Sequence, residues 1–331
     1  MIRLAPALLA AAAALPGATS PAFAQGADAP TPGSVIAAAP AADWRAIDPA
    51  DLMVMVLAPD AAGQERKVVL QLLPAPFSAG WLGNLRILAR AHWWDGTSVY
   101  RVVDNWVTQW GDADGEEPGK AKPLPPGLAT VAEEHYVTPV ERGPQDGRDF
   151  VQTGTGREEI VVSRYLDPYA ITGFVAGWPI GLDGEGGRTA WPVHCYGSVG
   201  VARNLSPDTG TGAELYAVNG TPPRALDRNI ALVARVIAGM EHLATLPRGT
   251  GEAGVYADPA QRVPIVSVRL GDDLPAAEQP RFEYLAPTSA SFAQLLQVRA
   301  NRDDPFYRVP AGGVDVCNAV PPVRRVGVSA G

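Results

Sequence analysis

A single arginine and a single glutamine stand in an otherwise apolar and aromatic setting between Tyr100 and Asp112. The guanidinium group of Arg101 could orient an amide or a carboxylate, because its N–H donors have a fixed, planar geometry. Gln109 could add an amide donor and acceptor on the same surface. Taken alone, the stretch also fits an amphipathic hairpin whose Arg101 merely faces solvent.

Two short strands are predicted to carry these side chains. β-Branched and bulky residues lie on both sides of Asp104-Asn105, a dipeptide that is typical of a turn. The wider composition agrees with a β-rich, loop-rich chain, since 35 glycines and 32 prolines among 331 residues leave few helical runs. The length suits one large domain or two ordinary ones. A net charge of −8 with dispersed acids argues against a nucleic-acid partner, which would need a basic patch.

The N-terminus has the pattern of a secretory signal peptide over residues 1–24. Arg3 precedes a short, Ala-rich apolar run, and Ala22-Phe23-Ala24 fits a cleavage site. The run is too short for a membrane span, so we expect no stable membrane insertion. Residues 25–42, rich in Ala, Pro and Gly, are predicted to be a flexible tether. We therefore expect a periplasmic or secreted protein.

Export changes the interpretation of the two cysteines, Cys195 and Cys317. An oxidising compartment favours a disulfide between them, and the alternative is two buried free thiols that never meet. The four histidines, His92, His135, His194 and His242, lack a His-x-x-x-His spacing. No metal or other cofactor is predicted.

Strands are predicted at residues 51–57 and 67–73, and a helix follows through Arg90 with apolar residues at helical spacing. The turn Trp94-Asp95-Gly96 then leads into the Tyr100–Asp112 hairpin. A second block contains a strand-like segment at 196–203, a polar loop at 206–212, a turn at 222–227, an apolar run at 231–240 and a last strand at 263–270.

These two blocks resemble the cyclophilin-type peptidyl-prolyl cis-trans isomerases. Trp94-Asp95-Gly96, Arg101, Trp106, Gln109 and Gly111-Asp112 occupy places of the first family motif, and Gly200-Val201-Ala202-Arg203 and Gly239-Met240 occupy places of the second. The resemblance implies a mainly β fold, a closed antiparallel eight-stranded barrel capped by two α-helices. The family-like domain would span 43–271, with an insertion at 113–194 and a C-terminal extension at 272–331 that holds a helix at 291–299. The insertion would be either a lid near the binding groove or a decoration elsewhere on the barrel.

The resemblance also implies roles for individual residues. Arg101 would be the catalytic donor and Gln109 would hold it while binding substrate backbone. The substrate-binding residues would be Trp106, Val107, Ala202, Arg203, Leu215 and Leu226. For Val107 and Leu226, an ordinary place in the barrel core is an equal alternative.

Several positions depart from the family pattern. Trp106 stands in place of phenylalanine, Leu215 in place of a second aromatic residue and Ala213 in place of a glutamine. We therefore predict a monomeric isomerase of X-Pro bonds in exported proteins, with weak or narrowed activity. One alternative is a degenerate module that binds Pro-containing segments without turning them over. Another is a structural envelope protein whose working surface is the insertion.

Overall fold

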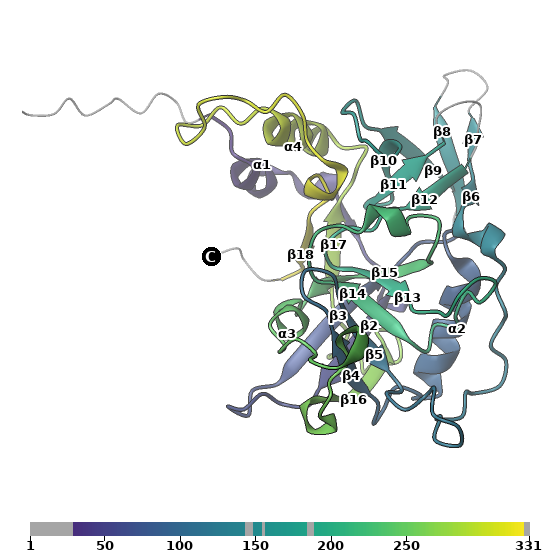
Figure 1. Cartoon of the computed structure of the whole chain (residues 1–331). Coiled ribbons are helices and arrows are strands. Elements are labelled where there is room, and N and C mark those ends of the chain that lie inside the picture. Colours follow the sequence, from purple (N-terminus) through teal and green to yellow (C-terminus); the bar gives the residue numbers. More distant parts are fainter. Residues whose placement is uncertain (1–28, 143–147, 154–155, 184–188, 328–331) are drawn as a thin grey trace, which may run out of the picture.

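A closed barrel of eight antiparallel strands forms the centre of the computed structural model, which describes residues 29–142, 148–153, 156–183 and 189–327 (Figure 1). Around the barrel the strands follow the order β13-β14-β5-β4-β16-β2-β3-β15. Their bounds are Leu52–Leu57 (β2), Arg66–Leu72 (β3), Ser98–Val102 (β4), Val107–Gly111 (β5), Ser198–Val201 (β13), Leu215–Val218 (β14), Leu232–Ala238 (β15) and Val263–Leu270 (β16). The predicted mainly β fold is confirmed.

Alternation along the strands fills the barrel. Met53, Met55 and Leu57 of β2 belong to the main core, whereas Leu52 and Val69 pack in a separate cluster on the outer wall. This is the two-residue period of a β-strand, which sends neighbouring side chains to opposite faces. The face to which a residue of β4, β5 or β14 points therefore decides whether it can take part in a surface site.

Two helices cover the barrel on opposite sides in Figure 1. Helix α2 (Ala79–Arg90) buries Trp81, Leu85 and Leu88 in the core, as its helical spacing predicts. Helix α3 (Glu241–Ala244) is short and contributes Leu243. No helix in the described part of the chain is both long and apolar enough to cross a membrane.

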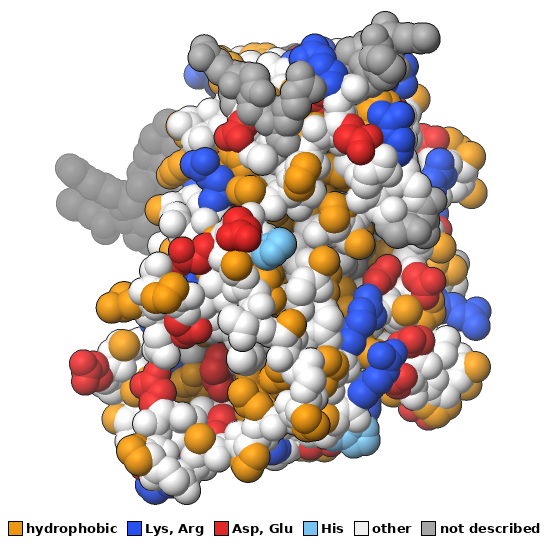
Figure 2. All heavy atoms as spheres, turned by 90° about the vertical axis from the view of Figure 1, so that its right-hand side faces the viewer, with side chains coloured by type: hydrophobic (Ala, Val, Ile, Leu, Met, Phe, Trp, Pro, Cys, Tyr) orange, Lys and Arg blue, Asp and Glu red, His pale blue; other side chains and the backbone are white. Residues whose placement is uncertain are grey.

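The insertion forms a sheet of its own in the order β6-β12-β11-β10-β9-β8-β7. Its strands are Thr138–Pro139 (β6), Glu141–Arg142 (β7), Asp149–Thr153 (β8), Gly156–Val162 (β9), Ile171–Val175 (β10), Trp178–Leu182 (β11) and Thr189–Pro192 (β12). Trp178 of this sheet lies 4.5 Å from the guanidinium carbon of Arg235, a buried residue of β15. The sheet therefore packs on the barrel wall. Figure 2 shows the face that looks right in Figure 1, where acidic, basic and hydrophobic side chains are interspersed.

The two ends of the described chain form a third part. Strands β1 (Trp44–Ala46), β17 (Phe282–Leu285) and β18 (Val323–Arg325) make a small sheet, and α1 (Pro32–Ala38) contacts α4 (Ala290–Ala300). The predicted tether is wrong where the structure describes it, because a Thr31–Ser34 capping box and buried Val35 order α1. The expected helix at 291–299 is confirmed as α4. The predicted signal peptide, residues 1–24, lies outside the described residues.

Cys195 and Cys317 form a disulfide, as predicted, with their Cα atoms 5.1 Å apart. The bridge ties the C-terminal extension to the segment just before β13. Phe174 of β10 also makes an edge-to-face contact with Phe292 of α4, their ring centroids 5.0 Å apart. The extension thus packs against the insertion rather than standing apart from it.

Candidate functional site

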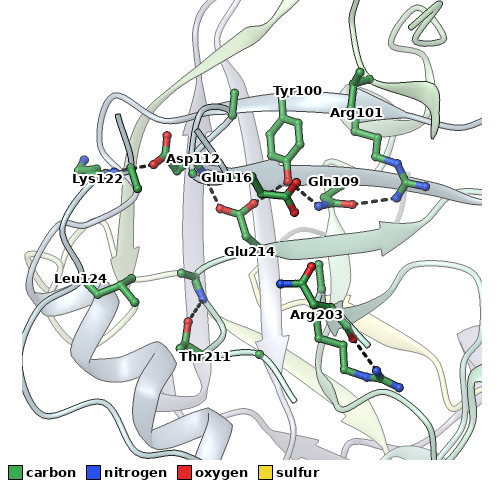
Figure 3. A pocket seen from close by; sticks show the side chains of 18 of the residues that line it. Tyr100, Arg101, Gln109, Asp112, Glu116, Lys122, Leu124, Arg203, Thr211 and Glu214 are labelled. Atoms are coloured by element: carbon green, nitrogen blue, oxygen red, sulfur yellow. Dashed lines mark hydrogen bonds between the residues drawn. The ribbon is translucent and has the colours of Figure 1, made fainter. Parts of the chain in front are cut away.

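A hollow of about 610 Å³ opens beside β4, β5 and β14 on the outside of the barrel (Figure 3). The strands contribute its polar wall, and two loops and the segment 253–262 complete it. The lining includes Tyr100, Arg101, Gln109 and Glu214, with Asp112, Glu116, Lys122 and Leu124 on the first loop and Ala202, Arg203, Asp208 and Thr211 on the second. The first stretch of the predicted insertion therefore borders the hollow, whereas none of the sheet β6–β12 lines it among the described residues.

A break in strand register places two consecutive residues of β4 on this surface. Val99 pairs with Trp110 and Arg101 pairs with Gln109, so Tyr100 is the extra residue of a β-bulge. A bulge changes the direction of the side chains around it. Tyr100 and Arg101 consequently both line the hollow, although regular alternation would send one of them into the core.

Arg101 is held from two sides and stays partly accessible. Its Nε donates to the carbonyl of Ala253 at 2.6 Å, and its Nη1 donates to Gln109 Oε1 at 2.8 Å. Its guanidinium carbon lies 5.1 Å from the ring centroid of Trp106. Burial lowers the pKa of Arg101, yet an arginine stays protonated in proteins. Nη2 has no hydrogen-bond partner among the described residues, so the group retains donors for a ligand.

A chain of hydrogen bonds continues behind Arg101. Gln109 Nε2 donates to the Tyr100 hydroxyl at 2.5 Å, and that hydroxyl donates to Glu214 Oε2 at 2.8 Å (Figure 3). Glu214 Oε1 accepts the backbone N–H of Asp112 at 2.7 Å. Gly111 is needed here: its φ is +149°, and a Cβ at this position would collide with the Glu214 carboxylate.

Burial sets the electrostatics of this chain. It raises the pKa of the Glu214 carboxyl to about 7, although the hydrogen bonds from Tyr100 and the Asp112 N–H oppose the shift. Nearby Asp112 and Glu116 raise it further. Burial and the neighbouring Glu214 raise the pKa of Tyr100, which therefore remains a hydroxyl donor at neutral pH.

An apolar cluster adjoins the hollow on the barrel's outer wall. It consists of Val107, Tyr216 and Val218 with partly buried Val103, Ala202, Leu226 and Ile230. Ala202 belongs to both the cluster and the lining of the hollow. Val107 is 2% exposed and Tyr216 is 4% exposed, so little of the cluster's centre is open. Trp106, at the turn between β4 and β5, is 39% exposed.

A buried polar network supports the cluster from behind. His194 Nε2 lies 3.0 Å from the Tyr216 hydroxyl, and His194 Nδ1 lies 2.9 Å from Asp227 Oδ1. Arg224 donates to Asp227 at 2.7 Å and to Asp167 at 2.8 Å. Asp167 comes from the insertion, between β9 and β10. The insertion thereby reaches the wall of the cluster through buried charges.

One of the predicted substrate residues, Leu215, needs correction. Leu215 is fully buried in the main core and does not line the hollow. Its neighbours, Glu214 just before β14 and Tyr216 on the strand, lie on the other face, because side chains alternate along an extended chain. Tyr216, and not Leu215, is the residue of this pair that belongs to the apolar cluster beside the hollow. The polar position expected at Ala213 is likewise occupied by Glu214, one residue further on.

The other predicted residues fall into three settings. Arg101 and Gln109 touch directly, and Ala202 and Arg203 line the same hollow. Val107 and Leu226 belong to the adjoining cluster, and Trp106 packs on Arg101 at its edge. Arg203 donates to the Asn229 and Asn204 carbonyls, which fixes it along the rim.

Sequence reasoning missed Tyr100, Glu214 and Tyr216. The alternation of Glu214, Leu215 and Tyr216 beside a core strand was the signal that could have identified the last two. No local sequence pattern predicts the β-bulge that brings Tyr100 to the hollow. No group of three or more His, Cys, Asp or Glu residues in the described part of the chain could hold a metal ion.

Residues 68–270 match the family described as cyclophilin type peptidyl-prolyl cis-trans isomerase/CLD. Among solved structures, a cyclophilin from Hirschia baltica is similar, with a TM-score of 0.60, 22% identity and coverage of 90% of this chain and 98% of that chain. A cyclophilin type peptidyl-prolyl cis-trans isomerase from Cryptosporidium parvum, crystallised in the presence of the dipeptide Ala-Pro, has a TM-score of 0.35, 10% identity and coverage of 65% and 98%. No curated protein matches the sequence.

Proposed function

This chain belongs to the cyclophilin-type peptidyl-prolyl cis-trans isomerase family, and from that premise we propose that it isomerises X-Pro bonds. Rotation about such a bond must overcome a barrier of about 18–20 kcal/mol, because amide resonance stiffens it. The twisted amide has lost that conjugation, and its prolyl nitrogen can then accept a hydrogen bond. A protein that donates to the twisted form more strongly than to the planar form lowers the barrier.

Arg101 is the observation that carries this proposal. It is held in place by Ala253 and Gln109, it packs on Trp106, and its Nη2 has no hydrogen-bond partner among the described residues. In the proposed complex the proline ring packs against Val107, Tyr216 and Leu226, and Arg101 donates to the twisted amide. Gln109 holds the guanidinium and also lies close enough to contact the peptide backbone.

The activity is proposed to be narrow. Val107 and Tyr216 are almost fully covered, so a proline ring has to displace part of the partly buried rim, Leu226 and Ile230. Substrates that make strong contacts elsewhere in the groove would offset the free energy needed to displace this rim. The same closure favours the alternative proposal, a module that binds Pro-containing segments and does not isomerise them.

A protease-coupled assay on proline peptides tests the proposal. We expect Arg101→Ala to lower kcat/KM on the order of 10²–10³-fold, as for loss of a donor to a developing charge. Arg228→Ala, an exposed arginine packed on Trp191, is the matched control and should retain the wild-type rate. Equal rates for wild type and Arg101→Ala would contradict catalysis. Peptide binding by NMR without enhanced cis-trans exchange would instead support the binding module.

We further propose that the protein is exported and acts as a monomer on exported polypeptides, without a cofactor. The N-terminal signal pattern and the Cys195–Cys317 disulfide support an oxidising compartment. The mass of the mature protein would test export. We expect a chain that begins at Gln25, with both cysteines in a disulfide and therefore no free thiol.

A further inference from the structure

The hydrogen bonds behind Arg101 run in one direction. Arg101 donates to Gln109, Gln109 donates to Tyr100, and Tyr100 donates to Glu214. The chain begins at a group that can only donate and ends, when Glu214 is ionised, at a group that can only accept. Every bond between these two ends therefore has a fixed sense.

Ionised Glu214 is what fixes that sense. A carboxylate obliges the Tyr100 hydroxyl to donate its proton to it, and Tyr100 then offers only lone pairs to Gln109. Gln109 must turn its amide nitrogen toward Tyr100 and its oxygen toward Arg101. Arg101 Nη1 thus finds an acceptor, which orients the guanidinium plane.

Protonated Glu214 removes the constraint. A neutral carboxyl group can donate to Tyr100, whose own proton is then free to point toward Gln109. The Gln109 amide can then rotate so that its oxygen accepts the Tyr100 proton. The rotated amide turns its NH₂ group toward Arg101, and two donors that face each other form no hydrogen bond. The guanidinium loses one of its two bonded holders and keeps only the Ala253 carbonyl.

Within the described part of the chain, no cation is bonded to the Glu214 carboxylate. Tyr100 faces it from β4, Gly111 and Asp112 from the end of β5, and Glu116 from the following loop. Besides Arg101, three cations line the hollow, and each bonds elsewhere. Lys122 Nζ donates to the Asp95 carbonyl, Arg203 donates to the Asn204 and Asn229 carbonyls, and Arg262 pairs with Asp114. The nearest acids and burial both favour the neutral form, and a pKa of about 7 results.

We infer that Glu214 is a positioning residue that aligns Arg101 through Tyr100 and Gln109, and that isomerisation is faster when Glu214 is ionised. The inference rests on the proposed function for its effect on rate. Its structural part, the pH-dependent orientation of Arg101 and Gln109, does not depend on activity.

The test compares wild type, Glu214→Gln and Glu133→Gln between pH 5.5 and 8.5, with Glu133 an exposed acid that does not line the hollow. We expect the wild-type kcat/KM on a proline peptide to fall about tenfold from pH 8 to pH 6, since only about a tenth of a group of pKa near 7 is ionised at pH 6. Glu214→Gln should give a flat profile at the low, acidic rate. Glu133→Gln should follow the wild type.

NMR of the Arg101 Nε–H and Gln109 amide signals provides the second readout. In the wild type both should shift with a midpoint near pH 7, and in Glu214→Gln neither should. Signals that do not titrate, or titrate equally in both proteins, would overturn the inference. Titrating signals in a protein with no activity at any pH would contradict the proposed isomerase function and support the positioning role.

Discussion

The site is supported by two polar networks that differ in how their charge is balanced. The chain behind Arg101 ends on Glu214, whose carboxylate bonds, among the residues that the structure describes, to a hydroxyl and a backbone N–H. The network behind Tyr216 contains an arginine, Arg224, between the two carboxylates of Asp167 and Asp227. In the first network the carboxylate is not bonded directly to a cation of the described residues. The second is buried and paired.

The difference separates a network that can respond to pH from one that holds a position. Unpaired Glu214 has a pKa near 7 because burial disfavours its charge. In the other network burial opposes the charge of Arg224, but its hydrogen bonds to Asp167 and Asp227 outweigh burial and raise its pKa. The Arg101 side of the groove should therefore change across neutral pH, whereas Arg224 keeps its charge and its place between Asp167 and Asp227.

Removing Arg224 should have the largest effect on stability. Arg224→Ala leaves the carboxylates of Asp167 and Asp227 buried without their cation, with side chains 2% and 7% exposed. Breaking such a pair costs about 3–5 kcal/mol in the free energy of unfolding. Urea unfolding at pH 7 measures it, with Arg228→Ala as the exposed control. A loss below about 1 kcal/mol would show that the network does not hold the insertion against the barrel.

Glu214→Gln should raise the free energy of unfolding relative to wild type as the pH increases, although removing a polar contact usually lowers it. The folded pKa of about 7 lies above the ordinary value of 4.5, so the stability contributed by neutral Glu214 is complete below pH 4.5. It is lost as the pH rises through 7. Since glutamine does not ionise, the variant should gain about 2.5 kcal/mol relative to wild type between pH 5 and pH 8.

Urea unfolding of both proteins at pH 5, 6.5 and 8 gives this difference. Glu133→Gln supplies the control for loss of a solvated acid, and its difference from wild type should not vary with pH. A difference between Glu214→Gln and wild type that is equally constant would refute the assigned titration.

The sequence was sufficient for the barrel, the disulfide and the Arg101–Gln109 pair, because each rests on a local pattern or on motif order. It failed at Leu215 because motif matching allowed a shift of one residue, and on a strand one residue exchanges the two faces. It also missed the bulge at Tyr100, which depends on pairing between β4 and β5. The network from Asp167 to Tyr216 joins residues 49 positions apart in the chain, and no local pattern predicts such a contact.

Two matched substitutions, Tyr216→Phe and Tyr100→Phe, compare the two networks by removing one hydroxyl group from each. Tyr216→Phe leaves buried His194 Nε2 without a partner and should cost about 1–3 kcal/mol in the free energy of unfolding. Tyr100→Phe frees Gln109 and Glu214 at the edge of the hollow, where water can replace the hydroxyl, so its cost should stay below about 1 kcal/mol.

Activity should respond in the opposite way, because Tyr100 connects Glu214 to Gln109, whose Oε1 accepts a hydrogen bond from Arg101. Tyr100→Phe should abolish the pH dependence of kcat/KM between pH 6 and pH 8, and Tyr216→Phe should retain it. Urea unfolding and the rate profile, measured on the same preparations, give both quantities. Loss of the pH dependence in Tyr216→Phe would mean that the two networks act as one, since the only route between them would then pass through the cluster that Tyr216 shares with Val107 and Ala202.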